Sequence, residues 1–462
     1  MNAPDLIVDP QLLARFDKPG PRYTSYPTAD RFVEAFGPDA YRAALRHRRG
    51  NKLARPLSLY VHLPFCNTIC YYCACNKVIT KDHGRSAKYI RYLAKEMDLV
   101  VAETGEGQRI EQLHWGGGTP TFLNPLELRE LMGTFRSRFD MARDGEYSIE
   151  VDPRSADPIT VAVLGELGFN RISMGVQDFD PEVQRAVNRI QPYAMTASCV
   201  RAARQAGFKS VNLDLIYGLP KQTPERFEDT LAKVTALAPE RVALYNYAHL
   251  PTVFKPQRRI NDADLPKAET RMALLTLAIR RLTEAGYVYI GMDHFARPDD
   301  ELAQAQRRGH LHRNFQGYST RAECDLVAFG ISAIGSIGAA YVQNVKTLDE
   351  YYDRLDQDVL PVMRGVELKP DDLVRRAVIQ ALMCHFAVAI ESIELAYLVD
   401  FRRYFASELE QLQAYAREGL VEIDDEWITV TAKGRLMVRA IAMVFDHHLR
   451  TTETRARYSK VV

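Results

Sequence analysis

Residues 57–77 read LSLYVHLPFCNTICYYCACNK, an apolar run that is followed at once by a loop with four cysteines. The run Leu57–Leu63 predicts a strand, because it is short, apolar and rich in β-forming residues. The cysteines of the loop are Cys66, Cys70, Cys73 and Cys75. The stretch therefore places a thiol-rich loop directly after the first strand of a larger pattern.

From Leu57 onward, runs of β-forming residues alternate with amphipathic helical stretches. We expect strands at Leu57–Leu63, Ile110–Trp115, Tyr147–Val151, Arg171–Val176, Ser210–Ile216, Arg241–Tyr247 and Tyr287–Met292. We expect helices at Ala87–Thr104, Pro125–Phe139, Thr196–Ala206, Glu225–Ala236 and Ala268–Ala285. Strands that alternate with helices predict a parallel sheet, and this many units indicate an α/β fold with a partial or full (β/α) barrel.

The pattern divides the chain into three predicted segments. Residues 1–50 form an extended N-terminal arm that leads into a short helix at Asp39–Arg48. Residues 51–365 form the (β/α) barrel domain. Residues 366–462 form a smaller, α-rich C-terminal domain with one hairpin at Gly419–Val430. The C-terminal segment has no catalytic constellation, so we expect the active site in the barrel domain.

Composition excludes several classes of partner. The 462 residues are 47% hydrophobic and 26% charged, which is typical of a globular protein with a substantial core. The 60 basic and 59 acidic residues give a formal net charge of +1, so no nucleic-acid partner is indicated. No apolar run approaches the roughly 18 residues of a membrane span, and the N-terminus does not resemble a secretory signal. We expect a cytoplasmic protein with no membrane partner.

The spacing C-x3-C-x2-C of the first three loop cysteines indicates a metal centre. Clustered thiols in a cytosolic protein favour metal or redox chemistry, and thiolates select zinc, copper(I) or iron–sulfur clusters. A structural zinc site usually takes pairs of ligands from two separated segments, whereas three thiols on one loop suit a [4Fe–4S] cluster with one open iron. We expect the three scattered cysteines, Cys199, Cys324 and Cys384, to be small buried hydrophobic residues.

Polar and glycine residues follow several of the expected strands, at the end where (β/α) barrels place their active sites. The run Gly116–Thr119 permits close approach of a ligand to the backbone, although a tight turn explains it equally well. It is neither a P-loop nor a GxGxxG motif. Glu150, Gln177, Arg189 and Asp214 also lie at or beyond strand ends, where each alone is more often a cap or a solvated residue.

The cysteine loop after the first strand of a βα array, with an aromatic residue before the third cysteine, resembles the radical S-adenosylmethionine (SAM) superfamily. The resemblance implies that Cys66, Cys70 and Cys73 bind a [4Fe–4S] cluster whose open iron chelates SAM. The reduced cluster then cleaves SAM to methionine and a 5′-deoxyadenosyl radical, which abstracts hydrogen from carbon. The resemblance also implies cofactor contacts at Tyr60, Tyr72, Gly117, Gly118, Thr119, Glu150, Gln177, Arg189, Asp214, Ala248 and Ile334.

Longer blocks along nearly the whole chain are similar to the oxygen-independent coproporphyrinogen III oxidases (dehydrogenases), and the extra cysteine Cys75 is the most specific match. Ala74 departs from this family, which usually has glycine there. The resemblance implies oxidative decarboxylation of two propionates of coproporphyrinogen III to vinyl groups, which gives protoporphyrinogen IX for haem biosynthesis. It also implies two bound SAM molecules, a monomer, and an electron donor and acceptor that the sequence does not identify.

The same resemblance implies importance for activity at Cys75, Phe315 and Gln316, although a packed loop explains the last two equally well. Cys75 is not expected to bind the cluster, because a fourth thiolate would occupy the open iron. Because the substrate carries four carboxylates, its pocket should contain basic groups. Candidates by position are Arg22, Lys77, Arg297 and Arg313.

Two alternative functions remain open. A related haem chaperone with the radical SAM fold would share the barrel, but such relatives generally lack the N-terminal arm and the fourth cysteine. A purely structural iron–sulfur protein would have no use for Gly116–Thr119 or Glu150. Turnover of coproporphyrinogen distinguishes the oxidase from both.

Overall fold

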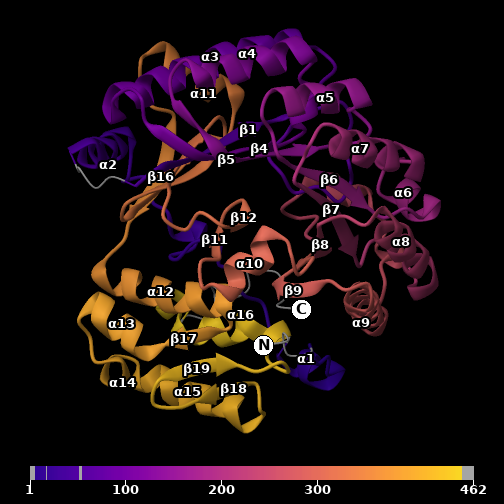
Figure 1. Cartoon of the computed structure of the whole chain (residues 1–462), viewed down its shortest axis with the longest axis vertical. Helices are drawn as coiled ribbons and strands as arrows, with labels where there is room; N and C mark the ends of the chain where they lie inside the picture. Colours follow the sequence, from indigo (N-terminus) through magenta and orange to yellow (C-terminus); the bar gives the residue numbers. More distant parts are fainter. Residues whose placement is uncertain (1–5, 17, 51–54, 450–462) are drawn as a thin grey trace. The chain divides into compact units, whose positions relative to one another are not determined.

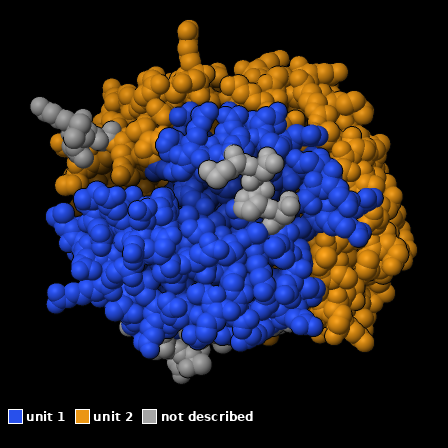
Figure 2. Space-filling model, turned by 60° about the horizontal axis from the view of Figure 1, so that its bottom comes forward, with its two compact units in different colours: residues 1–31, 279–322, 368–462 blue, residues 32–278, 323–367 orange. Residues whose placement is uncertain are grey.

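The structure is a computed structural model, and it describes residues 6–16, 18–50 and 55–449. The chain forms two compact units (Figure 1, Figure 2). Unit 1 contains residues 1–31, 279–322 and 368–462, and unit 2 contains residues 32–278 and 323–367. Each unit is therefore assembled from segments that lie far apart in the sequence. The division into an arm, a barrel domain and a C-terminal domain stays a prediction.

Unit 2 is built on a mixed sheet whose centre is parallel. Its parallel strands are β1 (Leu57–Leu63), β4 (Arg109–Gly117), β5 (Asp140–Val151), β6 (Arg171–Gln177), β7 (Ser210–Tyr217) and β8 (Arg241–Asn246). They pair in this order, each parallel to the next. On the other side of β1 the sheet continues with β13 (Asp325–Phe329), β14 (Ile334–Ile337), β15 (Ala340–Asn344) and β16 (Val362–Glu367). Only β13 in this group is parallel to its neighbour β1, and the other three strands pair antiparallel.

Helices connect the parallel strands and lie along the outer side of the sheet (Figure 1). They are α3 (Gly84–Thr104), α4 (Pro125–Arg136), α5 (Pro158–Glu166), α6 (Pro181–Ala186), α7 (Tyr193–Gln205) and α8 (Pro224–Leu237). Unit 2 also contains α2 (Pro38–Gly50) and α11 (Leu348–Asp356), and α9 (Ala268–Glu284) crosses the boundary between the units. This arrangement confirms the predicted α/β fold and has the strand–helix alternation of a partial (β/α) barrel.

Local sequence explains where these elements begin. Strand β1 is buried at every position except Tyr60, as expected for a parallel strand that is covered on both faces. Helix α4 begins after a capping box, in which the Asn124 side chain accepts from backbone N–H groups of the first turn and the Glu127 carboxylate accepts from the Asn124 backbone N–H. This cap fixes the residue at which α4 begins, and so it fixes the length of the loop between β4 and α4 beside the site.

Two predictions about elements were wrong. The expected strand Tyr287–Met292 is β9 (Val288–Gly291), which belongs to unit 1 and pairs antiparallel with β10 (His294–Ala296). Two residues separate these strands, which is too short for the crossover that a parallel pair needs. The N-terminal arm is also not irregular throughout, because α1 (Pro10–Phe16) forms within it.

Unit 1 is α-rich in its C-terminal part, as predicted. Its other helices are α10 (Glu301–Arg307), α12 (Pro370–His385), α13 (Ile390–Tyr397), α14 (Phe401–Tyr404), α15 (Ala406–Arg417) and α16 (Val438–Ala442). A small sheet has the order β17 (Ala387–Ala389), β19 (Trp427–Val430) and β18 (Val421–Ile423). The antiparallel pair of β18 and β19 confirms the predicted hairpin. In the part of the chain that the structure describes, no helix combines the length and the hydropathy of a bilayer crossing.

Candidate active site

The carboxyl ends of the parallel strands surround a cavity of about 620 Å³ in unit 2. Most of the predicted site residues line it, although they come from separate loops. These are Cys66, Cys70, Tyr72, Cys73, Cys75, Gly117, Gly118, Thr119, Glu150, Gln177, Arg189 and Asp214. The structure therefore brings together the thiols, the glycine turn, both carboxylates and the guanidinium.

The cysteine loop is closed at its base and fixed along its length. Two short parallel strands, β2 (Phe65–Cys66) and β3 (Val78–Ile79), join its two ends. Along the loop, Asn188 Nδ2 donates to the Ile69 carbonyl at 2.7 Å, and Gln257 Nε2 donates to the Tyr72 carbonyl at 3.0 Å. Because side chains from outside the loop satisfy these carbonyls, the loop holds one conformation in which its thiols face the cavity.

Lys77 supports the end of the loop from within. Its ammonium donates to the carbonyls of Cys73 and Cys75, each at 3.2 Å. A hydrogen bond from the Cys75 thiol and the charge of Lys77 lower the pKa of Cys73 to about 6, against the effect of burial. Burial raises the pKa of the Cys66 thiol to about 11. The thiols of the loop thus differ in acidity, because the loop surrounds each of them differently.

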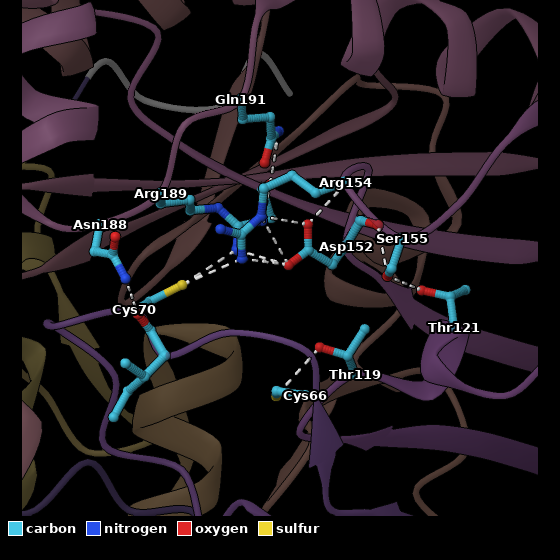
Figure 3. A network of polar contacts seen from close by, with 12 residues as sticks. Cys66, Cys70, Thr119, Thr121, Asp152, Arg154, Ser155, Asn188, Arg189 and Gln191 are labelled. Carbon is cyan, nitrogen blue, oxygen red and sulfur yellow. Dashed lines mark hydrogen bonds and ion pairs between the residues drawn. The ribbon is translucent and has the colours of Figure 1, made fainter. Parts of the chain in front are cut away.

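Cys70 is contacted by two guanidinium groups (Figure 3). Arg154 Nη2 lies 3.3 Å from Cys70 Sγ, and Arg189 Nη1 lies 3.7 Å from the same atom. Asp152 accepts from both arginines, at 2.7 Å from Arg154 Nη2 and 3.0 Å from Arg189 Nη1. The charges of Arg189 and Arg154 hold the pKa of Asp152 down to about 2, although burial acts in the opposite direction. A fixed carboxylate therefore orients two cations at the edge of the thiol loop.

The glycine turn after β4 packs directly against the start of the cysteine loop. Gly118 N donates to the Leu63 carbonyl at 2.8 Å. A Cβ atom at Gly118 would lie 2.5 Å from the carbonyl oxygen of Pro64, so only glycine fits. Gly117 has a positive φ of 117°, which glycine adopts without strain. Thr119 Oγ1 lies 3.3 Å from Cys66 Sγ. The glycine turn therefore lies beside the first thiol of the cysteine loop.

Two carboxylates face the cavity with different acidities. The hydrogen bond and charge of His114 hold the pKa of Glu150 below its usual value, although burial raises it. Burial, and the charge of Glu150, raise the pKa of Asp214 to about 7. Ser173 and Asn212 donate to Asp214 at 3.0 and 2.7 Å and fix its orientation. At neutral pH the pair carries at least one negative charge, which suits a ligand with a cationic group.

Arg189 supplies the opposite charge. Its guanidinium is buried, and Nη2 donates to the Gly175 carbonyl at 2.6 Å. Its Nε atom is buried and has no hydrogen-bond partner among the residues that the structure describes. Beside it, Gln177 ends β6 with a positive φ of 67°. An anionic ligand group that reached Arg189 would satisfy a donor that the protein leaves open.

The donors around the cavity fit an iron–sulfur cluster together with a zwitterionic ligand. Three soft thiols share one fixed loop, as a cluster with one open iron requires. The glycine turn packs closely against the start of the cysteine loop, and carboxylates and a guanidinium surround the remaining space.

The other predicted site residues do not line this cavity. Tyr60 stacks on His114 with ring centroids 5.8 Å apart. The carbonyl of Ala248 accepts from Gln257 at 3.2 Å, and Ile334 begins β14. The roles of Tyr60, Ala248 and Ile334 stay predictions.

Phe315 and Gln316 lie in unit 1, in the turn between β11 (His312–Asn314) and β12 (Gly317–Ser319). Gln316 N donates to Asn314 Oδ1 at 2.9 Å, which tightens the turn. The predicted roles of both residues in catalysis likewise stay predictions.

Arg154 lines the cavity as well, and no sequence motif predicted it as a site residue. Arg154 follows the end of β5 by three positions and reaches back to Cys70, 84 residues earlier in the chain. The only sign of this role in the sequence is that Arg154 is a charged residue just beyond a parallel strand and close to Asp152. Ser173 and Tyr245 also line the cavity and carry no motif.

Comparison with known proteins identifies the family. The chain matches the radical SAM superfamily over residues 60–234 and the HemN C-terminal domain over residues 368–437. It is 53% identical to the oxygen-independent coproporphyrinogen III oxidase of Pseudomonas aeruginosa over 98% of both chains. It is 48% identical to the Escherichia coli protein of the same name over the full length of both chains.

A solved structure agrees with these sequence matches. The coproporphyrinogen III oxidase of Escherichia coli, described as a radical SAM enzyme, superposes with a TM-score of 0.91. The superposition covers 96% of this chain and all of the solved one, at 48% identity. Family, domain order and site geometry therefore point the same way, and the chain belongs to the oxygen-independent coproporphyrinogen III oxidases of the radical SAM superfamily.

Proposed function

We propose that this enzyme converts two propionates of coproporphyrinogen III to vinyl groups without oxygen and so gives protoporphyrinogen IX. The observation that carries the proposal is the single cavity at which three loop thiols, a glycine turn and two carboxylates meet. The relatives that share about half of its sequence carry the name of this activity. In each conversion the propionate loses one hydrogen atom, one electron and carbon dioxide.

In this proposal Cys66, Cys70 and Cys73 would hold a [4Fe–4S] cluster, and the glycine turn would contact SAM. When bound, the cluster and SAM supply the electron and the hydrogen-abstracting radical. The chain's own residues bind and orient. Glu150 is ionised at neutral pH and pairs with the ammonium of SAM, whereas Arg189 pairs with its carboxylate.

We assign Cys75 to the substrate side of the loop, or to the side of a second SAM molecule. Its thiol is exposed at the cavity, and it donates to Cys73. A fourth thiolate on the cluster would remove the iron position that SAM needs, so Cys75 must stay off the cluster. We assign Phe315 and Gln316 to the substrate, together with a basic group for its carboxylates.

Two candidate anchors in unit 1 already have protein partners. Arg22 pairs with Asp293, and the guanidinium of buried Arg313 lies 4.8 Å from the centre of the Tyr318 ring. These contacts hold both cations in place before a substrate arrives.

We also propose that the protein is a monomer of the cytoplasm, served by a separate electron donor and a one-electron acceptor. A reducing compartment suits its free cysteines, because disulfides do not persist there. The haem-chaperone alternative has no support among the relatives named above, which are both oxidases.

The test is anaerobic turnover. Reconstituted protein is incubated with coproporphyrinogen III, SAM and a reductant, and the porphyrins are analysed by mass spectrometry. We expect the loss of two carbon dioxide molecules per substrate, and no loss with a Cys70→Ser variant. Stable haem binding without vinyl product would instead assign the chaperone function.

A further inference from the structure

Arg154 and Arg189 each place a guanidinium nitrogen against the Cys70 thiol, and Arg154 is the nearer of the two. Its Nη2 lies 3.3 Å from Cys70 Sγ, within the range of a hydrogen bond to sulfur (Figure 3). Arg189 is farther from that sulfur, at 3.7 Å, and its Nη1 and Nη2 atoms also donate to Asp152 and to the Gly175 carbonyl. Arg154 is therefore the better placed donor to Cys70.

The position of Arg154 is fixed by Asp152. The carboxylate accepts from the backbone N–H of Arg154 at 3.0 Å, from its Nε at 3.0 Å and from its Nη2 at 2.7 Å. Both side chains are mostly buried, with 19% and 13% of their surface exposed. Two of these bonds hold the guanidinium itself, so the side chain loses little further entropy when it binds a sulfur atom.

The charges at this edge of the loop do not cancel. Two guanidinium groups, from Arg154 and Arg189, face one ionised carboxylate, Asp152, so a net positive charge remains beside Cys70. Arginine stays protonated under all conditions of interest. This positive charge acts through a short distance in a partly buried site, where solvent screens it weakly.

We propose that Arg154 is a positioning residue that donates a charge-assisted hydrogen bond to the Cys70 thiolate and thereby raises the reduction potential of the cluster. The inference rests on the proposed function, because it requires the cluster to be bound by Cys66, Cys70 and Cys73. Reduction adds one electron to the cluster and its thiolates. A donor to a ligating sulfur stabilises that added negative charge and makes the electron easier to accept.

The test replaces Arg154 with Gln and measures the midpoint potential of the cluster by titration followed by electron paramagnetic resonance, without SAM or substrate. We expect the reduced-to-oxidised ratio at a fixed potential to fall about tenfold, which corresponds to a midpoint about 59 mV more negative for one electron. Iron content should stay at four per chain. The matched control is Arg129→Gln, because Arg129 pairs with Glu166 on the exposed surface of unit 2.

A second variant, Arg154→Lys, keeps the charge but loses the planar fork, and we expect a smaller shift in the same direction. A wild-type midpoint in both Arg154 variants, with iron retained, would overturn the proposal. Loss of iron from both would also overturn it, since Arg154 would then be needed to assemble the cluster. If the wild type binds no cluster, the proposed function itself fails. If the midpoint potential shifts in the variants but the wild type does not turn over coproporphyrinogen, only the proposed substrate is contradicted, and the role of Arg154 stands.

Discussion

Of the three cysteines proposed to bind the cluster, Cys70 is the one that is buried, and two guanidinium groups contact its thiol. A serine hydroxyl is a hard ligand with a high pKa, so Cys70→Ser should lose most of the iron and all cleavage of SAM. Iron analysis and the visible spectrum measure this directly. Full iron with normal activity in this variant would contradict the assignment.

The matched control for that variant is Cys199→Ser. Cys199 is buried in α7 and donates to the Ala156 carbonyl at 3.3 Å, a bond that serine can keep. Cys199 lies outside the cysteine loop and is not among the residues that line the cavity. We expect this variant to retain its iron.

Glu150 tests the cofactor site separately from the cluster. Glu150→Ala removes an ionised partner of the ligand's ammonium but no proposed iron ligand. A hydrogen bond to a charged group contributes about 1.5–3 kcal/mol, so affinity for SAM should fall about 10- to 150-fold. Calorimetry on the reconstituted protein gives the affinity, with Glu166→Ala on the exposed surface as the control. Unchanged affinity would remove Glu150 from the cofactor site.

Cys75 lies two residues after Cys73, yet the proposed chemistry requires it to stay off the cluster. Cys75→Ser should therefore keep the [4Fe–4S] spectrum and lose most of the turnover of coproporphyrinogen. Both quantities are measured on one preparation. A variant without its cluster would indicate that Cys75 is a ligand, and a variant with normal turnover would indicate a spare thiol.

At the residue scale, the sequence predicted the groups whose spacing is itself diagnostic. The three cysteines and the glycine turn each belong to a short motif. The spacing within each motif largely determines how its residues lie relative to one another. Arg154 could not be predicted in this way, because its contact joins positions 84 residues apart. That contact depends on the angle at which one strand end faces another loop, which no local pattern encodes.

Among the elements, the buried parallel strands were the most predictable. Strand β1 has the predicted bounds, and β6 and β7 differ from the prediction only at their last residue. Strands β13 to β16 were missed because they are short and because only one helix, α11 between β15 and β16, interrupts them. Strand β9 was assigned to the wrong partner, since apolar periodicity does not distinguish a parallel strand from one arm of a hairpin.

Helix α3 joins this missed region to the rest of unit 2 through one buried carboxylate, Glu96. Its oxygens accept from Gly330 N at 2.8 Å, Tyr351 OH at 2.6 Å and Asn344 Nδ2 at 2.7 Å. These donors belong to the turn after β13, to α11 and to the end of β15. Burial nevertheless raises the pKa of Glu96 to about 7, because the three donors offset only part of the lost hydration.

This raised pKa predicts a dependence of stability on pH. The folded state keeps a proton on Glu96 up to about pH 7, whereas the unfolded chain loses it near the ordinary glutamate value. The contribution of Glu96 is therefore fully present at low pH and is lost as pH rises toward 7, by about 3 kcal/mol. Urea unfolding at several pH values should show this slope in the wild type.

The control for that slope is Glu96→Gln, which cannot titrate. Its free energy of unfolding relative to the wild type should increase with pH between about 5 and 7. Parallel curves for the two proteins would contradict the raised pKa. Gln presents one amide group to a set of donors, so the variant should be less stable than the wild type at low pH.

At the scale of the whole molecule, residues 21–31 of the N-terminal arm meet residues 439–448 within unit 1. Tyr23 OH donates to Asp446 Oδ2 at 3.0 Å, and Arg439 Nε donates to the Pro21 carbonyl at 3.1 Å. Arg31 Nη2 donates to the His448 carbonyl at 2.7 Å. The sequence predicted an N-terminal arm but not its contacts with the C-terminal segment, because contacts across more than four hundred residues leave no periodic signal.

The arm should therefore be held by a few buried polar contacts, and Tyr23→Phe tests the most enclosed of them. The substitution removes only the hydroxyl and leaves the carboxylate of buried Asp446 without that donor. Loss of a partner for a buried group costs about 1–3 kcal/mol, so protection of residues 20–31 against hydrogen exchange should fall about 5- to 150-fold.

The control is Tyr92→Phe, which removes an exposed hydroxyl bond to Asp356 in unit 2 and should leave the arm unchanged. Iron content should stay normal in both variants, because the cysteine loop is held by residues of unit 2 alone. Equal protection of the arm in wild type and Tyr23→Phe would mean that the apolar burial of Tyr23 and Tyr26, rather than the hydroxyl bond, keeps the arm in place.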